Sequence, residues 1–128
     1  MRALWAVVTG AEILVLLCTA PVRVEASRPL SPIVVDWERH FTVDAQGAEA
    51  RGRTVVQGTI RNTSDYTTRR IQLLVEGLNA RGTVVSQRVE WLGGDLQPGA
   101  HLYFEIPART PAASYRVSVF AFDHTRKS

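Results

Sequence analysis

The stretch Val55–Ser64, VVQGTIRNTS, alternates apolar and polar side chains and then ends in a cluster of turn-forming residues. This alternation is typical of a β-strand with one buried face, which we expect over 54–62. Gly58, in the middle of that strand, allows a neighbouring element to approach closely or hosts a bulge. Asn62 is expected to end the strand, because its side chain hydrogen-bonds its own backbone in turns. The stretch therefore predicts a framework strand.

The same alternation recurs along the chain after residue 30, interrupted by Gly, Pro, Asn and Asp. Asn79–Gly82 is typical of a tight hairpin, and Gln97–Ala100 of a type II turn. The polar segment 44–51 is expected to be a loop. The expected strands are 33–37, 40–43, 54–62, 70–78, 83–92, 101–106 and 115–122. Short strands at this spacing predict an all-β, immunoglobulin-like antiparallel β-sandwich of six to seven strands.

The alternation also assigns a face to each side chain. Apolar residues occupy both faces of 70–78, which indicates a central strand or partial cover from a loop. The residues expected to face the core are Val85, Val89, Trp91, Leu102, Phe104, Ile106, Tyr115, Val117, Val119 and Ala121, and those expected to face solvent include Ser86, Arg88, Glu90 and Tyr103.

The first 26 residues have the pattern of a secretory signal peptide. Arg2 precedes an apolar run, and Ala26 is a small residue of the kind that a signal peptidase accepts. The run is interrupted by Glu12 and is shorter than the about 20 apolar residues that cross a bilayer. We therefore expect residues 1–26 to be removed and residues 27–128 to form the β-sandwich domain, periplasmic or extracellular, with no stable membrane span after processing. An uncleaved N-terminal anchor is the alternative.

Charge and cysteine content exclude several classes of partner and chemistry. The chain has 15 Lys and Arg against 12 Asp and Glu, a formal net charge of +3, with no dense basic run. Such a mild charge does not favour nucleic acid as a partner. The one cysteine, Cys18, lies in the expected signal peptide, so the domain is expected to fold without disulfides and without thiol chemistry.

A series of strand and turn positions between about residues 53 and 122 forms an ordered pattern. Its positions are Val56, Gly58, Ile60, Asn62 and Ser64, then Ile71, Leu73 and Val75, then Leu78–Gly82 with Val84 and Val85, then Leu96–Gly99, and finally Phe104, Tyr115, Val117 and Val119. In this pattern the chain resembles the FxLYD-type family of bacterial envelope domains. The resemblance implies a small immunoglobulin-like sandwich without catalytic residues. Leu78–Asn79 stands where the family usually has a tyrosine and an aspartate.

No constellation of reactive side chains is evident. His40, His101 and His124 are far apart and form no HxH or HxxxH pair, so no metal site is expected from one element, although a composite site stays open as an alternative. Asp36 and Glu38 are expected on one exposed strand, which does not provide the two carboxylates across a cleft that a glycosidase needs. We therefore expect no enzyme activity, no catalytic residues, no cofactor and no metal.

Aromatic residues provide the candidate binding positions. Phe120 and Phe122 are expected opposite the core face of 115–122, where two phenylalanines indicate a docking patch that Tyr103 extends. The alternative is that the segment 33–37 covers them. Trp91 and Tyr103, with neighbouring polar groups, are the candidates for a sugar or small-ligand site.

These observations favour a non-catalytic, exported protein-interaction module of the cell envelope. Its partner is expected to be an envelope or extracellular protein, bound by a strand edge or by the Phe120 and Phe122 face. A small-ligand or carbohydrate-binding β-sandwich domain is the alternative. The oligomeric state and the identity of the partner do not follow from the residues.

Overall fold

The computed structural model describes residues 29–125, and the expected signal peptide, residues 1–26, lies outside the described residues. The elements in chain order are the short 3-10 helix η1 (Trp37–Arg39) and the strands β1 (Phe41–Ala50), β2 (Arg53–Asn62), β3 (Thr68–Leu78), β4 (Val84–Leu92), β5 (His101–Pro107) and β6 (Ser114–His124). Within this part of the chain, no helix is both long and apolar enough to cross a bilayer.

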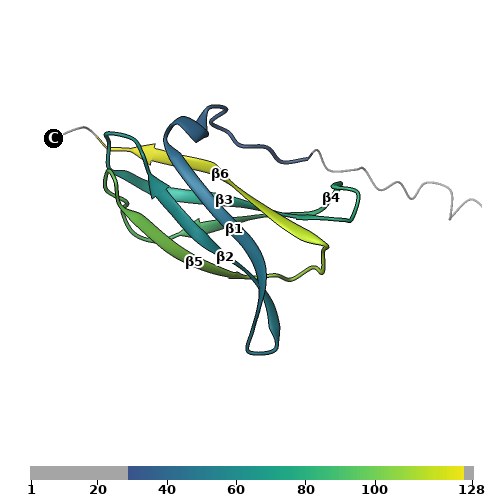
Figure 1. Cartoon of the computed structure of the whole chain (residues 1–128). Coiled ribbons are helices and arrows are strands. Elements are labelled where there is room, and N and C mark those ends of the chain that lie inside the picture. The colour runs from purple at the N-terminus through teal and green to yellow at the C-terminus, as the bar shows by residue number, and fades with distance from the viewer. Residues whose placement is uncertain (1–28, 126–128) are drawn as a thin grey trace, which may run out of the picture.

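The strands form two three-stranded antiparallel sheets that share one core. One sheet has the order β1-β2-β5 and the other the order β4-β3-β6 (Figure 1). Because β2 pairs with β5 and β3 pairs with β6, the chain crosses between sheets in the manner of immunoglobulin-like sandwiches. The expected all-β sandwich is therefore confirmed, with six strands in the described residues.

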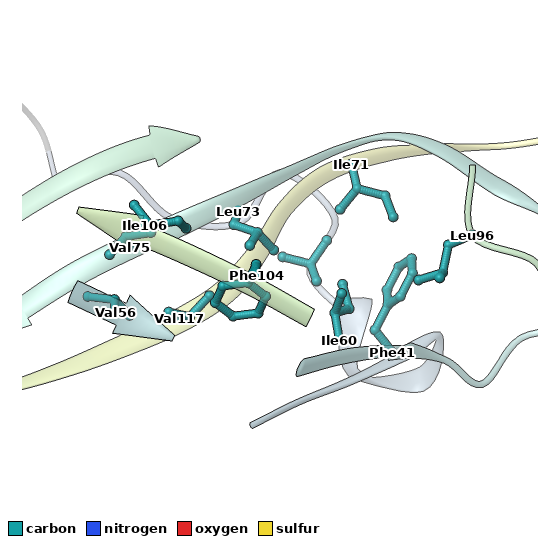
Figure 2. Packing of buried hydrophobic residues seen from close by; sticks show 11 residues of the cluster. Phe41, Val56, Ile60, Ile71, Leu73, Val75, Leu96, Phe104, Ile106 and Val117 are labelled. Carbon is teal, nitrogen blue, oxygen red and sulfur yellow. The ribbon is translucent and has the colours of Figure 1, made fainter. Parts of the chain in front are cut away.

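The shared core lies between the sheets and contains apolar side chains from both of them. Phe41, Val56, Ile60, Phe104 and Ile106 come from one sheet. The other sheet and its connections contribute Ile71, Leu73, Val75, Leu96, Val117 and Val119 (Figure 2). Burial of these side chains is the main source of stability, because the described residues contain no cysteine.

Strand β2 contains residues 55–62 of the stretch VVQGTIRNTS and is a framework strand, as predicted. Val56 and Ile60 are fully buried. An added Cβ at Gly58 would lie 2.2 Å from the carbonyl oxygen of Asp44, so glycine permits the close approach of β1. Asn62 ends the strand as expected, because its Oδ1 accepts the backbone N–H of Ser64 at 2.9 Å.

Both predicted turns are present. In the β3–β4 hairpin, the N–H of Gly82 donates to the carbonyl of Asn79 at 2.9 Å, and Gly82 has a φ of 81°. Before β5, the N–H of Ala100 donates to the carbonyl of Gln97 at 2.9 Å, and Gly99 has a φ of 79°. Glycine is suited to both positions because a left-handed φ carries no Cβ penalty there.

The N-terminal quarter of the domain differs from the expectation. The segment 44–51 is not a loop, because β1 continues to Ala50 and pairs with β2 along its whole length. Pairing satisfies the backbone donors and acceptors that face β2, even though the side chains of β1 are largely polar. The segment 33–37 is not a strand: it forms bends that lead into η1, with Ile33 66% exposed.

The faces of β4 are inverted relative to the expectation. The core residue Leu73 pairs with Glu90 and Val75 pairs with Arg88, so the side chains of Glu90 and Arg88 point to the inner side of the sandwich. Val89 and Trp91 point to the outer side, and Trp91 is 66% exposed. The reason is a register shift at Gly77 and Leu78, because a slip of one residue exchanges the two faces of a strand.

Two irregularities in the pairing of β3 with β6 change the alternation of β6. Leu73 pairs with Val119 and Gln72 pairs with Ala121, which leaves Phe120 as an extra residue. As a result Ala121, expected to face the core, lies opposite Gln72 on the outer side. Phe122 turns inward and packs against the core, so its expected position beside Phe120 on a solvent face is wrong.

Candidate functional site

The candidate surface is the outer face of the β4-β3-β6 sheet, which is the side that points away from the other sheet. Three rows of paired residues cross it from β4 through β3 to β6. They are Trp91, Gln72 and Ala121, then Val89, Leu74 and Ser118, then Gln87, Glu76 and Arg116. The middle row is apolar at β3, and the third row is polar throughout.

Exposed apolar side chains are concentrated on β4 and on the segment before η1. Among the residues that the structure describes, the exposed large apolar side chains on β4 and on the segment before η1 are Leu30, Ile33, Val35, Val84, Val85 and Trp91, and only Tyr66 and Tyr103 lie elsewhere. Trp91 on β4 is the largest of them. A concentration of this kind is typical of an interaction surface.

The leader, which we define as residues 29–36, runs across the outer face. It leaves η1 and continues toward the β3–β4 hairpin (Figure 1). At its start, Leu30 is hydrogen-bonded to the side chain of Gln87 on β4, and further on the N–H of Ile33 donates to the carbonyl of Phe120 on β6 at 2.8 Å. Since these contacts lie on either side of β3, the leader passes over Leu74, which is only 1% exposed.

The third row, which we call the polar row (Gln87, Glu76 and Arg116), is connected by hydrogen bonds. Glu76 is 6% exposed. Its Oε1 accepts from Nε of Arg116 at 2.9 Å, and its Oε2 accepts from Nε2 of Gln87 at 2.8 Å. The hydrogen bond and the charge of Glu76 raise the pKa of Arg116 above its usual value. The carboxylate is thus held between two donors, which compensates for its burial.

The four residues expected to bind a partner do not come together. Trp91 lies on the outer face of the β4-β3-β6 sheet, whereas Tyr103 is 59% exposed on the outer side of β5, in the opposite sheet. Phe120 is half-buried, and its carbonyl is occupied by the leader. Phe122 is partly buried and packs against the core. A single patch of Phe120, Phe122 and Tyr103, and a single ligand site of Trp91 and Tyr103, are both incompatible with these positions.

Trp91 borders a shallow hollow at the end of β4. The hollow has a volume of about 450 Å³ and is lined by Arg69, Arg70, Trp91, Leu92, Gly93, Gly94 and Asp95. The ion pair of Arg69 with Asp95, 3.5 Å between Nη2 and Oδ2, lies at its rim. Arg70 has a left-handed φ of 56° in the irregular part of β3. The hollow therefore combines an aromatic surface with charged groups of both signs.

A cluster of aromatic side chains at the C-terminal end of β6 was not predicted as a unit. The ring centroids of His40 and His124 are 4.9 Å apart, and those of His124 and Tyr66 are 5.1 Å apart. Phe122 packs against both histidines. Partial burial, and then the charge of His40, lower the pKa of His124. No three His, Cys, Asp or Glu side chains in residues 29–125 are grouped to hold a metal ion.

A cavity of about 190 Å³ lies between the sheets near β4 and β5. Val56, Val75, Arg88, Pro107 and Tyr115 are among its lining residues. Nη2 of Arg88 donates to the carbonyl of Pro107 at 2.7 Å, which links the two sheets at this open side. Nε of Arg88 lies 2.6 Å from a Glu90 oxygen, but its N–H is not directed at that oxygen. The inward guanidinium follows from the inverted faces of β4.

No family model, curated protein or solved structure matches the chain, so the resemblance to FxLYD-type domains stays a prediction.

Proposed function

We propose that the chain is a non-catalytic protein-interaction module, exported to the cell envelope or beyond, that binds its partner through β4 and the outer face beside it. The observation that carries the proposal is Trp91, which is 66% exposed on a strand whose other exposed side chains, Val84 and Val85, are also apolar. Tryptophan is enriched at the centres of protein interfaces because it buries a large apolar area on binding. Tryptophan in that position therefore supports recognition of another protein.

The position of β4 in its sheet supports the same proposal. Within the described residues β4 is hydrogen-bonded to β3 along one edge only. Its second edge offers backbone donors and acceptors to an extended partner strand, while Trp91 and Val89 supply adjacent apolar contacts. An exported location follows from the pattern of residues 1–26. Cleavage after Ala26 predicts a mature chain that begins at Ser27, which intact-mass spectrometry of the exported protein measures.

The test compares two exposed aromatic residues on opposite sheets. Trp91→Ala and Tyr103→Ala are introduced separately into the full chain, and each variant is used to capture proteins from envelope extracts. We expect Trp91→Ala to weaken binding of the captured partner by about tenfold or more, as for an interface hot spot. Tyr103→Ala is expected to leave binding unchanged. Equal capture by both variants and the unsubstituted chain would count against β4 as the binding surface.

A small-ligand or carbohydrate-binding domain is the second candidate, and the hollow beside Trp91 favours it. An aromatic ring next to Arg69, Arg70 and Asp95 provides a stacking surface and polar groups for sugar hydroxyls. On a glycan array, this candidate requires saturable binding of a sugar that Trp91→Ala abolishes. Protein capture without any sugar binding would favour the interaction module.

A further inference from the structure

The backbone of Leu30 is recognised by a side chain rather than by a strand. Its N–H donates to Oε1 of Gln87 at 2.8 Å, and its carbonyl accepts from Nε2 of the same amide at 2.8 Å. This pairing imitates the two hydrogen bonds that a residue exchanges with its neighbour in an antiparallel ladder. The amide of Gln87 therefore binds the backbone of an extended residue, and the binding does not depend on the side chain of that residue.

The amide of Gln87 is held in the orientation that this pairing needs. Its Nε2 also donates to Oε2 of Glu76 at 2.8 Å, so its Oε1 is directed at the N–H of Leu30. Glu76 is in turn fixed by Arg116 at 2.9 Å. Each strand of the sheet contributes one residue to this polar row. Burial of the Glu76 carboxylate is tolerated because each of its oxygens accepts a hydrogen bond, so the polar row presents the amide of Gln87 in a fixed orientation.

The rest of the leader shows what the site accepts. The N–H of Ile33 donates to the carbonyl of Phe120, the extra residue of β6. Pro32 and Val34 are half-buried against the protein, whereas Ile33 and Val35 are 66% and 87% exposed. The occupant is therefore a segment that bends after its proline and whose alternate residues, a proline and an aliphatic one, contact the sheet.

From this geometry we infer that the polar row, Leu74 and Phe120 form a binding site for a proline-containing aliphatic segment of another polypeptide, and that the leader is its intramolecular occupant. This leader site specifies the kind of partner that the proposed interaction module binds and rests on that proposal. The leader is held by three backbone hydrogen bonds and two half-buried side chains. An incoming segment that makes the same contacts displaces it.

The test uses a synthetic peptide of residues 29–36, PLSPIVVD, as the probe. The leader site is opened in the full chain by Leu30→Pro with Ile33→Pro, because proline has no N–H to donate at either position. We expect saturable binding of the labelled peptide to this opened variant by fluorescence anisotropy. Binding to the unsubstituted chain is expected to be at least about tenfold weaker, because the tethered leader competes at high effective concentration.

Matched controls assign the binding to the polar row. Gln87→Ala in the opened variant is expected to weaken peptide binding by about tenfold, from the loss of two hydrogen bonds. Gln57→Ala makes the same change on the opposite sheet and is expected to have no effect. A peptide with proline at the positions of Leu30 and Ile33 is expected not to bind.

Three results would overturn the inference. One is the absence of saturable peptide binding to an opened variant whose circular dichroism spectrum is unchanged, and another is equal binding after Gln87→Ala. The third is a dimer of the unsubstituted chain, seen by light scattering, that Leu30→Pro with Ile33→Pro dissolves, because the occupant is then a second copy. Trp91-dependent capture that persists while peptide binding fails would remove the leader site alone and leave the interaction module in place.

Discussion

The ring centroids of His40 and His124 lie 4.9 Å apart, and the ring planes make an angle of 69°. This contact brings the start of β1 next to the end of β6. His40 directly precedes β1 and His124 is the last residue of β6. Oγ1 of Thr68 lies 3.3 Å from Nδ1 of His124, and Phe122 packs against both rings. Charging both imidazoles brings two positive charges together in a partly buried cluster, which is unfavourable.

The histidine pair predicts that acid destabilises the domain. Partial burial and the charge of His40 lower the pKa of His124 in the folded chain. The unfolded chain then binds more protons than the folded chain below about pH 6.5, so stability falls as the pH decreases through that value. We expect the Tm measured by differential scanning calorimetry to decrease from about pH 7 to about pH 5.

The substitution His124→Gln checks the origin of this effect. We expect it to make the Tm less dependent on pH across that range, because one of the two interacting imidazoles is removed. His101→Gln changes an exposed histidine of β5 and is expected to keep the full dependence. An unchanged slope in His124→Gln would assign the acid sensitivity to other groups.

Gly58 is predicted to be irreplaceable by alanine. An added Cβ would lie 2.2 Å from the Asp44 carbonyl oxygen and 2.7 Å from Cα of Ala45, so β1 would have to move away from β2. We expect Gly58→Ala to lower the free energy of unfolding by about 2–4 kcal/mol in urea denaturation. Gly93→Ala, where an added Cβ meets nothing within 4 Å, is the control and is expected to change stability by less than about 1 kcal/mol.

The sequence alone was sufficient to predict the elements whose structure depends on neighbouring residues. β2 and the hairpin at Asn79–Gly82 follow from alternation and turn chemistry, and both were predicted. The start of β1 lies in the predicted strand 40–43, but its continuation over 44–50 was missed because Asp44, Gln46 and Glu49 make it as polar as a loop, while its strand state depends on pairing with β2. Pairing partners are distant in sequence and leave no local signal.

The candidate site was harder to predict than the fold, because one-residue shifts in strand register decide which side chains face outward. The irregular register at Gly77 and Leu78 places Trp91 outside, and the extra residue Phe120 turns Phe122 inside. Alternation alone gives the opposite result for both Trp91 and Phe122. The contact of Leu30 with Gln87 joins residues that are distant in sequence, and the Pro-rich start of the leader indicated only that it is extended.

Asn62 is predicted to be essential to the loops at one end of the sandwich. It is fully buried, and its Nδ2 donates to the carbonyls of Tyr66 at 2.7 Å and Leu96 at 2.8 Å. We expect Asn62→Ala to cost about 2–4 kcal/mol in urea denaturation, because a fully buried amide that links Tyr66, Leu96 and Ser64 loses all of its hydrogen bonds. Asn79→Ala removes an amide that caps an exposed hairpin and is expected to cost about 1 kcal/mol or less. Equal costs would contradict the role given to Asn62.

Leu73 and Leu74 are adjacent, fully buried and on opposite faces of β3, which makes them a matched pair for testing the cover provided by the leader. Each leucine is expected to lose about 2–4 kcal/mol on replacement by alanine in the unsubstituted chain. In the variant with Leu30→Pro and Ile33→Pro, Leu74 has already lost its cover. Leu74→Ala is therefore expected to cost about 1 kcal/mol less there, whereas the cost of Leu73→Ala stays the same. A double-mutant cycle from urea denaturation measures the difference, and the same coupling for both leucines would mean that the leader stabilises the domain as a whole rather than covering the outer face.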